Sequence, residues 1–249
     1  MQSVSIVLIQ VRVMSDPMAR HEAACVQRRL EGLSVTLQVR NVFAEEPHVG
    51  WLRGADVVLI GGSGAYSVHD VRSTAWVDGL RRILDHALDR DMVGMGLCFG
   101  HQLLAHHFGG EVVTDSAAAE VGTIEVFLTE LGEADPVLGV LGSGEVRVQT
   151  GHGDSVLAPP EGLEVLARSA GPATQVFRVN GGRFYSTQFH PDLTAVEAQE
   201  RYDALYQIGE GASVEPPEAP NALFESGADA STVLLAQLVE TSFFGERSS

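Results

Sequence analysis

The sequence contains no lysine, and this absence excludes several chemistries. All 16 basic residues among the 249 are arginines, and they face 33 Asp and Glu, which gives a formal net charge of -17 at pH 7. Schiff-base cofactors such as pyridoxal phosphate and phosphate-loop nucleotide sites both require a lysine side chain. So acidic a chain also lacks the basic surface that nucleic-acid phosphates need. We therefore expect neither lysine-dependent catalysis nor nucleic-acid binding.

Cysteines and long apolar runs are also scarce. The chain has two cysteines, Cys25 and Cys98, which is typical of a reducing compartment rather than of a disulfide framework. No apolar run approaches the roughly 18 residues that cross a bilayer, and the N-terminus enters a strand-like run without the basic leader of a signal peptide. We expect a cytoplasmic protein with no membrane partner.

Strand-like and helix-like segments alternate in the first part of the chain, with short connections. The expected strands are 4–11, 33–39, 55–60 and 92–97, and the expected helices are 18–30, 73–88 and 99–108, with Ser73 as an N-cap. This alternation is the signature of a doubly wound, mostly parallel sheet with helices on both faces, and hence of an α/β fold.

The second part has a different pattern, with short strand-like runs at 122–128, 145–149, 175–179 and 183–187. These predict a smaller antiparallel strand extension, followed by helices at 195–208 and 230–243 and an acidic, proline-rich loop at 209–220. We expect a single domain over 1–249, with a core at about 4–192 and a C-terminal helical extension at about 193–249.

The most informative stretch is GLCFG at residues 96–100, between an expected strand and an expected helix. This context matches a nucleophile elbow with sulfur in place of the serine oxygen. The glycines on either side of Cys98 leave no Cβ atoms where a sharp turn brings backbones together. The amino terminus of the following helix would stabilise a thiolate. A buried structural cysteine is the alternative, and it is our interpretation of Cys25, which has no elbow around it.

A thiol nucleophile needs a proton acceptor that a third group holds in place. His190 and Asp192 supply both, directly after the expected strand 183–187. Gly61 to Gly64 form a second glycine loop at a strand end, where backbone N–H groups can stabilise an oxyanion. The dinucleotide pattern G-x-G-x-x-G fails there, because Ser67 occupies its last glycine position.

Four motifs occur in order along the chain, namely IGGSG, GLCFGHQLLA, TGHGDSV and QFHPD. Together they resemble the class I glutamine amidotransferase family, in particular the amidotransferase domain of GMP synthase and its free-standing relatives. The resemblance implies that Cys98 attacks the side-chain amide of glutamine, forms a γ-glutamyl thioester and releases ammonia. It also implies that His190 shuttles the proton, that Asp192 orients His190, and that the amides of Gly62 and Phe99 form the oxyanion hole.

The resemblance further implies that Gln102, Gly151 and His152 help to hold the substrate, and that no metal or organic cofactor takes part. The sequence departs from the family at two positions: it has Asp192 where glutamate is usual, and Ser63 where proline is usual. No synthase domain follows the motifs, so any ammonia acceptor would be a separate synthase subunit.

Two alternatives remain open. A γ-glutamyl peptide or amide hydrolase would use the same triad on another substrate, and a catalytically silent binding module would use only the fold. A zinc site on the helix after the elbow is disfavoured, because His101 and His106 are five residues apart and poorly placed to chelate one ion.

Overall fold

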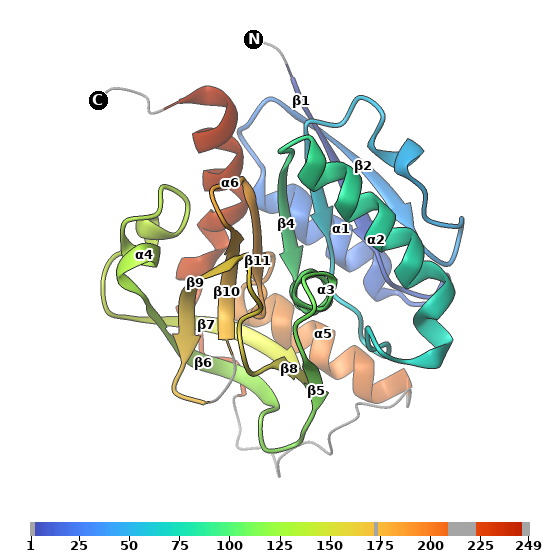
Figure 1. The fold of residues 1–249 in the computed structure, drawn as a ribbon. Coiled ribbons are helices and arrows are strands. Elements are labelled where there is room, and N and C mark those ends of the chain that lie inside the picture. Colours follow the sequence, from blue (N-terminus) through green and yellow to red (C-terminus); the bar gives the residue numbers. More distant parts are fainter. Residues whose placement is uncertain (1–2, 172–173, 209–222, 246–249) are drawn as a thin grey trace.

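The computed structural model describes residues 3–171, 174–208 and 223–245, and its centre is a nine-stranded sheet with helices on both faces (Figure 1). The strands lie in the order β2-β1-β3-β4-β11-β10-β9-β6-β7. Their bounds are β1 Val4–Gln10, β2 Val35–Asn41, β3 Val57–Ile60, β4 Val93–Leu97, β6 Glu120–Leu128, β7 Glu145–His152, β9 Leu163–Ser169, β10 Thr174–Val179 and β11 Phe184–Thr187. A separate antiparallel pair joins β5 Val112–Thr114 to β8 Asp154–Val156.

Helices connect and cover these strands. The α-helices are α1 Met18–Arg29, α2 Thr74–Asp89, α3 Phe99–His107, α4 Glu130–Glu133, α5 Ala195–Ile208 and α6 Leu234–Val239. Short 3-10 turns occupy Val49–Leu52, Val71–Ser73, Leu138–Leu141 and Ala230–Val233, and a π turn occupies Glu240–Phe244.

The direction of the strands divides the sheet into two parts. β2, β1, β3, β4 and β11 pair in parallel, whereas β11, β10, β9, β6 and β7 pair antiparallel. The antiparallel extension is therefore continuous with the parallel sheet. This arrangement confirms the predicted α/β fold class.

Both faces of the parallel part are buried. Along β1, Ile6 and Leu8 pack with residues of α1 and α6 in one apolar cluster, whereas Val7 and Ile9 pack with α2 and α3 in another. Because successive side chains of a strand point to opposite faces, one apolar run feeds both cores. In Figure 1, α2 and α3 accordingly lie in front of the sheet, and α1 and α5 lie behind it.

Two local expectations differ from the structure. Ser73 does precede α2, but its hydroxyl makes no capping bond; instead the carboxylate of Asp70 accepts a hydrogen bond from the Arg72 amide and starts a 3-10 turn. The expected helix 230–243 is divided into 3-10, α and π segments. The Thr241 hydroxyl donates to the Gln237 carbonyl there, which competes with the backbone ladder.

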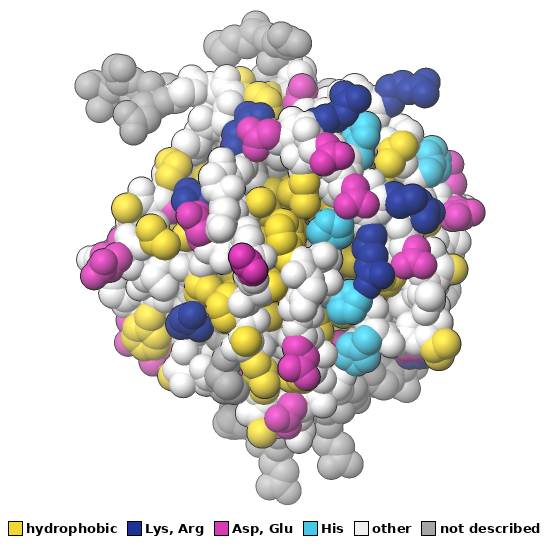
Figure 2. Space-filling model, viewed as in Figure 1, with side chains coloured by type: hydrophobic (Ala, Val, Ile, Leu, Met, Phe, Trp, Pro, Cys, Tyr) yellow, Lys and Arg dark blue, Asp and Glu magenta, His cyan; other side chains and the backbone are white. Residues whose placement is uncertain are grey.

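The surface carries both signs of charge at short spacing. On the face shown in Figure 2, arginine side chains lie among acidic ones. Among the residues that the structure describes, no helix is long and apolar enough to cross a membrane. The acidic loop predicted at 209–220 lies outside the described residues.

Candidate active site

Three neighbouring parallel strands, β3, β4 and β11, end at the same edge of the sheet. Thr187 of β11 lies opposite Leu97 of β4, and β3 flanks β4 on the other side. The segments that follow these strands are the glycine loop 61–64, Cys98 and the segment 188–192. Because ligand sites of open α/β sheets lie at the carboxyl ends of the strands, these segments form the candidate site.

Cys98 occupies a strained turn between β4 and α3. Its φ of 50° and ψ of -95° are unusual for a residue with a side chain. A Cβ on Gly96 would lie 2.5 Å from the Gly100 backbone, and one on Gly100 would lie 2.5 Å from the Ile60 carbonyl oxygen. The Cys98 amide donates to the Thr187 carbonyl at 2.7 Å. The two glycines thus permit the close backbone packing that presents the sulfur at the edge.

The sulfur of Cys98 is enclosed by protein. Its hydrogen-bond partners are the Gly151 carbonyl oxygen at 3.9 Å and the side-chain nitrogen Nε2 of Gln188 at 3.7 Å. Burial raises the pKa of the thiol to about 12, although the charge of Arg201 and the amide of Phe99 act in the opposite direction. The amide of Phe99 at the start of α3 thus favours a thiolate, as expected, but the desolvation of the buried sulfur outweighs it.

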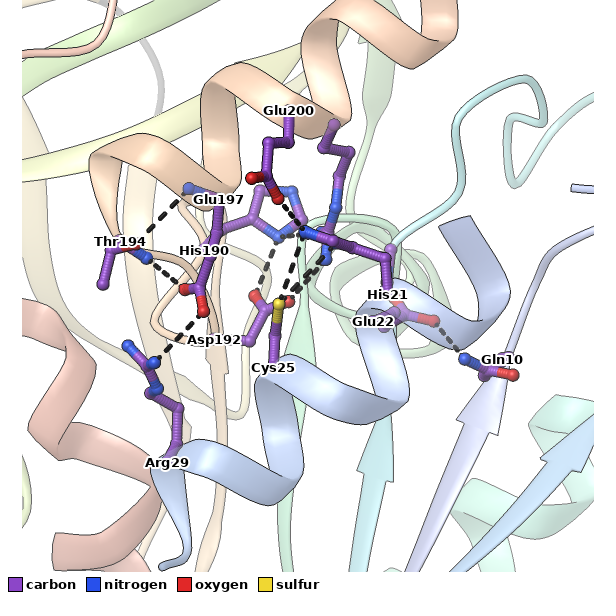
Figure 3. A network of polar contacts seen from close by, with 12 residues as sticks. Gln10, His21, Glu22, Cys25, Arg29, His190, Asp192, Thr194, Glu197 and Glu200 are labelled. Atoms are coloured by element: carbon purple, nitrogen blue, oxygen red, sulfur yellow. Dashed lines mark hydrogen bonds and ion pairs between the residues drawn. The ribbon is translucent and has the colours of Figure 1, made fainter. Parts of the chain in front are cut away.

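His190 and Asp192 form a buried pair beside the cysteine. The Nδ1 atom of His190 lies 3.0 Å from Oδ1 of Asp192, whose side chain is fully buried. A Cβ on Gly62 would lie 3.0 Å from Cε1 of His190 and 3.7 Å from Cβ of Cys98, so the three residues converge. Burial opposes ionisation of Asp192, yet the charges of Arg201 and His190 hold its pKa far below the usual value. Figure 3 shows the pair within a polar network between α1 and α5.

The Gly62 amide, an expected oxyanion donor, is engaged elsewhere. It donates to Oε1 of Glu22 on α1 at 3.2 Å. The other carboxylate oxygen of Glu22 accepts from Gln10 at 2.9 Å and from Arg12 at 3.3 Å. A buried carboxylate needs such donors, so the glycine loop is held toward α1 in this arrangement.

Ser63 stands where the resembled family usually has proline. Its hydroxyl accepts a hydrogen bond from the Tyr66 amide at 2.9 Å, which closes a short turn. This bond restrains the glycine loop at the position where the fixed φ of proline is missing.

The remaining expected substrate residues, Gln102 on α3 and Gly151 and His152 at the end of β7, meet at the loop that follows β7. Gln102 donates to the Asp154 carbonyl at 2.9 Å. His152 places Nε2 3.0 Å from the Glu120 carboxylate and Nδ1 3.0 Å from the same Asp154 carbonyl. The backbone carbonyl of Gly151 faces the sulfur of Cys98, as described above. Gln102 and His152 therefore fix the loop, and its backbone is what approaches the thiol.

The histidines after the elbow point to different partners. His101 is fully buried, stacks on Phe177 with ring centroids 4.5 Å apart, and lies 2.9 Å from the Ser186 hydroxyl. Burial lowers its pKa to about 3, so the ring is neutral. His106 instead contacts Arg81. The His101 ring packs in the core and the His106 ring contacts Arg81, so the two rings do not share a partner.

Comparison with known proteins decides the family. The model of "Glutamine amidotransferase class-I" matches residues 23–204, which is most of the chain. The chain belongs to the class I glutamine amidotransferase family. The matched range includes the glycine loop, Cys98, His152 and the His190–Asp192 segment, and it extends into α5.

Curated relatives of this glutamine amidotransferase include a glutamine-hydrolyzing GMP synthase subunit of Sulfurisphaera tokodaii, 31% identical over 152 residues, which are 61% of this chain and 75% of that one. A glutamine-hydrolyzing GMP synthase of Nitratidesulfovibrio vulgaris is 30% identical over 176 residues, which are 71% of this chain but 32% of that protein. A solved glutamine amidotransferase from Thermotoga maritima has the same fold, with a TM-score of 0.70, 18% identity, and coverage of 97% and 98% of the two chains.

These matches confirm the predicted family and the predicted enzyme class, a glutamine amidotransferase. The roles of the individual residues remain predictions. Sequence reasoning missed two charged residues at the site, Glu22 and Arg201. The signal for Arg201 was its isolation: between residue 195 and the end of the chain the only other basic residue is Arg247, against ten acidic ones.

Proposed function

We propose that this chain hydrolyses the side-chain amide of glutamine through a thioester on Cys98. His190 moves the proton, and Asp192 keeps the His190 ring oriented. The observation that carries the proposal is a cysteine with a φ of 50° at a strand end, which lies beside Gly62 together with a buried imidazole–carboxylate pair.

In the first half of the reaction, Sγ of Cys98 attacks the amide carbon of glutamine. Because burial holds the pKa of the thiol at about 12, the proton must leave as the carbon–sulfur bond forms, and His190 accepts it. The carbon–nitrogen bond then breaks, His190 returns the proton to the amide nitrogen, and ammonia leaves. In the second half, water attacks the thioester with His190 as base, which releases glutamate and restores the thiol.

The oxyanion of each tetrahedral intermediate requires backbone donors. The Phe99 amide lies next to the sulfur at the start of α3. The Gly62 amide joins it once the Gly61–Gly62 peptide turns away from Glu22. Glycine on both sides of that peptide makes such a rotation inexpensive, so we propose that substrate completes the oxyanion hole.

We further propose that the ammonia passes to a separate synthase subunit, and that the chain works as one domain in the cytoplasm. The relatives from Sulfurisphaera tokodaii and Haloquadratum walsbyi, the second 34% identical over 113 residues, both bear the name of a GMP synthase subunit. Two free thiols, Cys25 and Cys98, support a reducing compartment.

The test is ammonia release from free glutamine and from γ-glutamyl peptides by the purified chain, both alone and with a co-purified synthase subunit. We expect glutamine to be preferred. A preference for γ-glutamyl peptides would favour the other hydrolase, and inertness toward both, in the presence and absence of the synthase, would contradict the proposal.

A further inference from the structure

Asp192 shares its carboxylate between two residues, His190 and an arginine to which neither the family match nor the motifs assign a role. Oδ1 of Asp192 faces Nδ1 of His190, and Oδ2 accepts a hydrogen bond from Nη2 of Arg201 at 2.9 Å. Nη1 of Arg201 lies 3.2 Å from the same Nδ1 atom of His190. The Arg201 side chain is only 7% exposed, so a guanidinium is buried directly behind the imidazole.

We propose that Arg201 is a positioning residue of the Cys98 site, which fixes the orientation of Asp192 and thereby the ring of His190. The proposal rests on the function proposed above. It also accounts for the departure at residue 192, because a short aspartate reaches His190 with one oxygen when a second group anchors the other.

The guanidinium is itself held by the way α5 begins. Thr194 and Glu197 form a reciprocal cap, in which the Glu197 carboxylate accepts from the Thr194 amide at 2.8 Å and the Thr194 hydroxyl accepts from the Glu197 amide at 3.3 Å. Glu197 also pairs with Arg28 at 2.7 Å and with Arg29 at 3.3 Å on α1. Figure 3 shows Thr194, Glu197 and Arg29 at this junction. The cap and the ion pairs dock the helix that carries Arg201.

The hydrogen bonds of Arg201 show what orients it. Its Nε atom is buried without a hydrogen-bond partner among the described residues, so the two terminal nitrogens, which face Asp192 and His190, determine its placement. A carboxylate as deeply buried as that of Asp192 is stable only when its charge is paired. Arg201 supplies that pairing.

The charge of Arg201 also reaches the sulfur. The charged or titratable groups that influence the Cys98 thiol or lie near it are His190, Asp192 on the segment after β11, Asp154 on β8 and Arg201 on α5. The two carboxylates disfavour a thiolate, and the Arg201 charge is the largest influence that favours one. Removing Arg201 should therefore slow thiolate chemistry at Cys98 even when glutamine is absent.

The experiment uses the full chain with Cys25→Ala, so that alkylation reports Cys98 alone. Arg201→Met removes the charge, and Arg201→Lys keeps the charge without the planar fork. Arg29→Met is the matched control, because it removes an arginine from the same α1–α5 contact while Glu197 keeps its shorter ion pair with Arg28 and its cap with Thr194. The readouts are the rate of iodoacetamide alkylation from pH 6 to 10, and kcat and KM for glutamine.

For Arg201→Met we expect alkylation to slow about tenfold at each pH, equivalent to a pKa shift of about one unit. We also expect kcat to fall at least about tenfold, with KM within about threefold, since a misplaced His190 affects the chemical step. Arg201→Lys should recover part of both effects. Arg29→Met should stay within about twofold of the parent.

A folded Arg201→Met variant with parental alkylation and kcat would overturn the inference. If that variant does not fold, Arg201→Lys decides, and parental values for the lysine variant would equally refute a role for the fork. If the parent releases no ammonia but Arg201→Met still slows alkylation, the proposed function fails while the positioning role stands.

Discussion

The two cysteines are both buried thiols, but their backbones are very different. Burial raises the pKa of both thiols to about 12. Sγ of Cys25 lies 3.6 Å from Nδ1 of His21, whose Nε2 lies 3.3 Å from the Glu200 carboxylate. Judged by side-chain contacts alone, Cys25, His21 and Glu200 would pass for a triad as readily as the residues around Cys98.

What separates the two cysteines is where the backbone places the sulfur. Cys25 lies inside a regular helix, α1, and packs with Leu193 and Ala198. Cys98 lies at a strand end with a positive φ, next to Gly62 of the glycine loop. We therefore base the proposal of Cys98 as the nucleophile on backbone strain and position at the sheet edge, and not on the neighbours of the sulfur.

The largest expected effect comes from replacing each cysteine in turn by alanine. Cys98→Ala should lower glutamine hydrolysis at least about a thousandfold, since the covalent route is lost. Cys25→Ala should stay within about twofold. Ammonia release measures both, and urea unfolding verifies that each variant is folded. Comparable losses in the two variants would break the distinction between the sites.

The carboxylates provide the next contrast. Asp192→Asn should reduce kcat about a hundredfold or more, because an amide neither stabilises the imidazolium nor selects the correct tautomer of the neutral imidazole. Glu200→Gln should change kcat less than about twofold, because the Glu200 side chain is 60% exposed and its pair with His21 is screened by water. Steady-state kinetics with glutamine test the two variants. A large loss of kcat in the Glu200 variant would indicate that Cys25, His21 and Glu200 take part in the reaction.

Breaking the elbow should cost stability as well as activity. Gly100→Ala places a Cβ 2.5 Å from the Ile60 carbonyl oxygen, so we expect a loss of about 3 kcal/mol in the free energy of unfolding and a displaced Cys98. Gly182→Ala is the control, because its Cβ would meet Val179 at an ordinary 3.5 Å. Denaturant unfolding gives the difference, and equal stability of the two variants would argue against a tightly packed elbow.

The smallest expected effect is on the pH dependence of stability, and the two cysteines share it. Both folded-state pKa values, about 12, exceed the unfolded value of about 8.5. Their contribution to stability is thus complete below pH 8.5 and is lost as the pH rises toward 12. At pH 10 each thiol should lower the free energy of unfolding by about 2 kcal/mol. In each alanine variant the free energy of unfolding should depend less steeply on pH between 8.5 and 10. If the slope for Cys98→Ala equals that of the parent, the Cys98 thiol of the parent ionises in the folded state.

The features that the sequence predicted well depend on neighbours in the chain. The elbow needs Gly96 and Gly100 around Cys98, and the histidine and its carboxylate are two residues apart. The alternating strands and helices of the first part follow from local periodicity in the same way. The strand β9, Leu163–Ser169, was missed because a register irregularity between β9 and β10 disturbs its alternation of buried and exposed residues.

The features that were missed depend on docking between distant segments. Glu22 reaches the Gly62 amide across 40 residues, and it does so because α1 packs against a face of the sheet. Arg201 reaches Asp192 only because α5 begins with a cap and is fixed to α1 by Glu197. Neither contact corresponds to a residue spacing that can be recognised in a single sequence. The depth at which the Cys98 thiol is buried is likewise absent from the sequence, because burial is a tertiary property.

The most direct measurement of the central claim is covalent labelling with a glutamine analogue that carries a chloroketone in place of the side-chain amide. Peptide mass spectrometry identifies the labelled thiol, with and without excess glutamine. We predict a single label on Cys98, with glutamine protecting it, and unmodified Cys25. Labelling of Cys25, or labelling of Cys98 that glutamine does not slow, would contradict the assignment of Cys98 as the nucleophile.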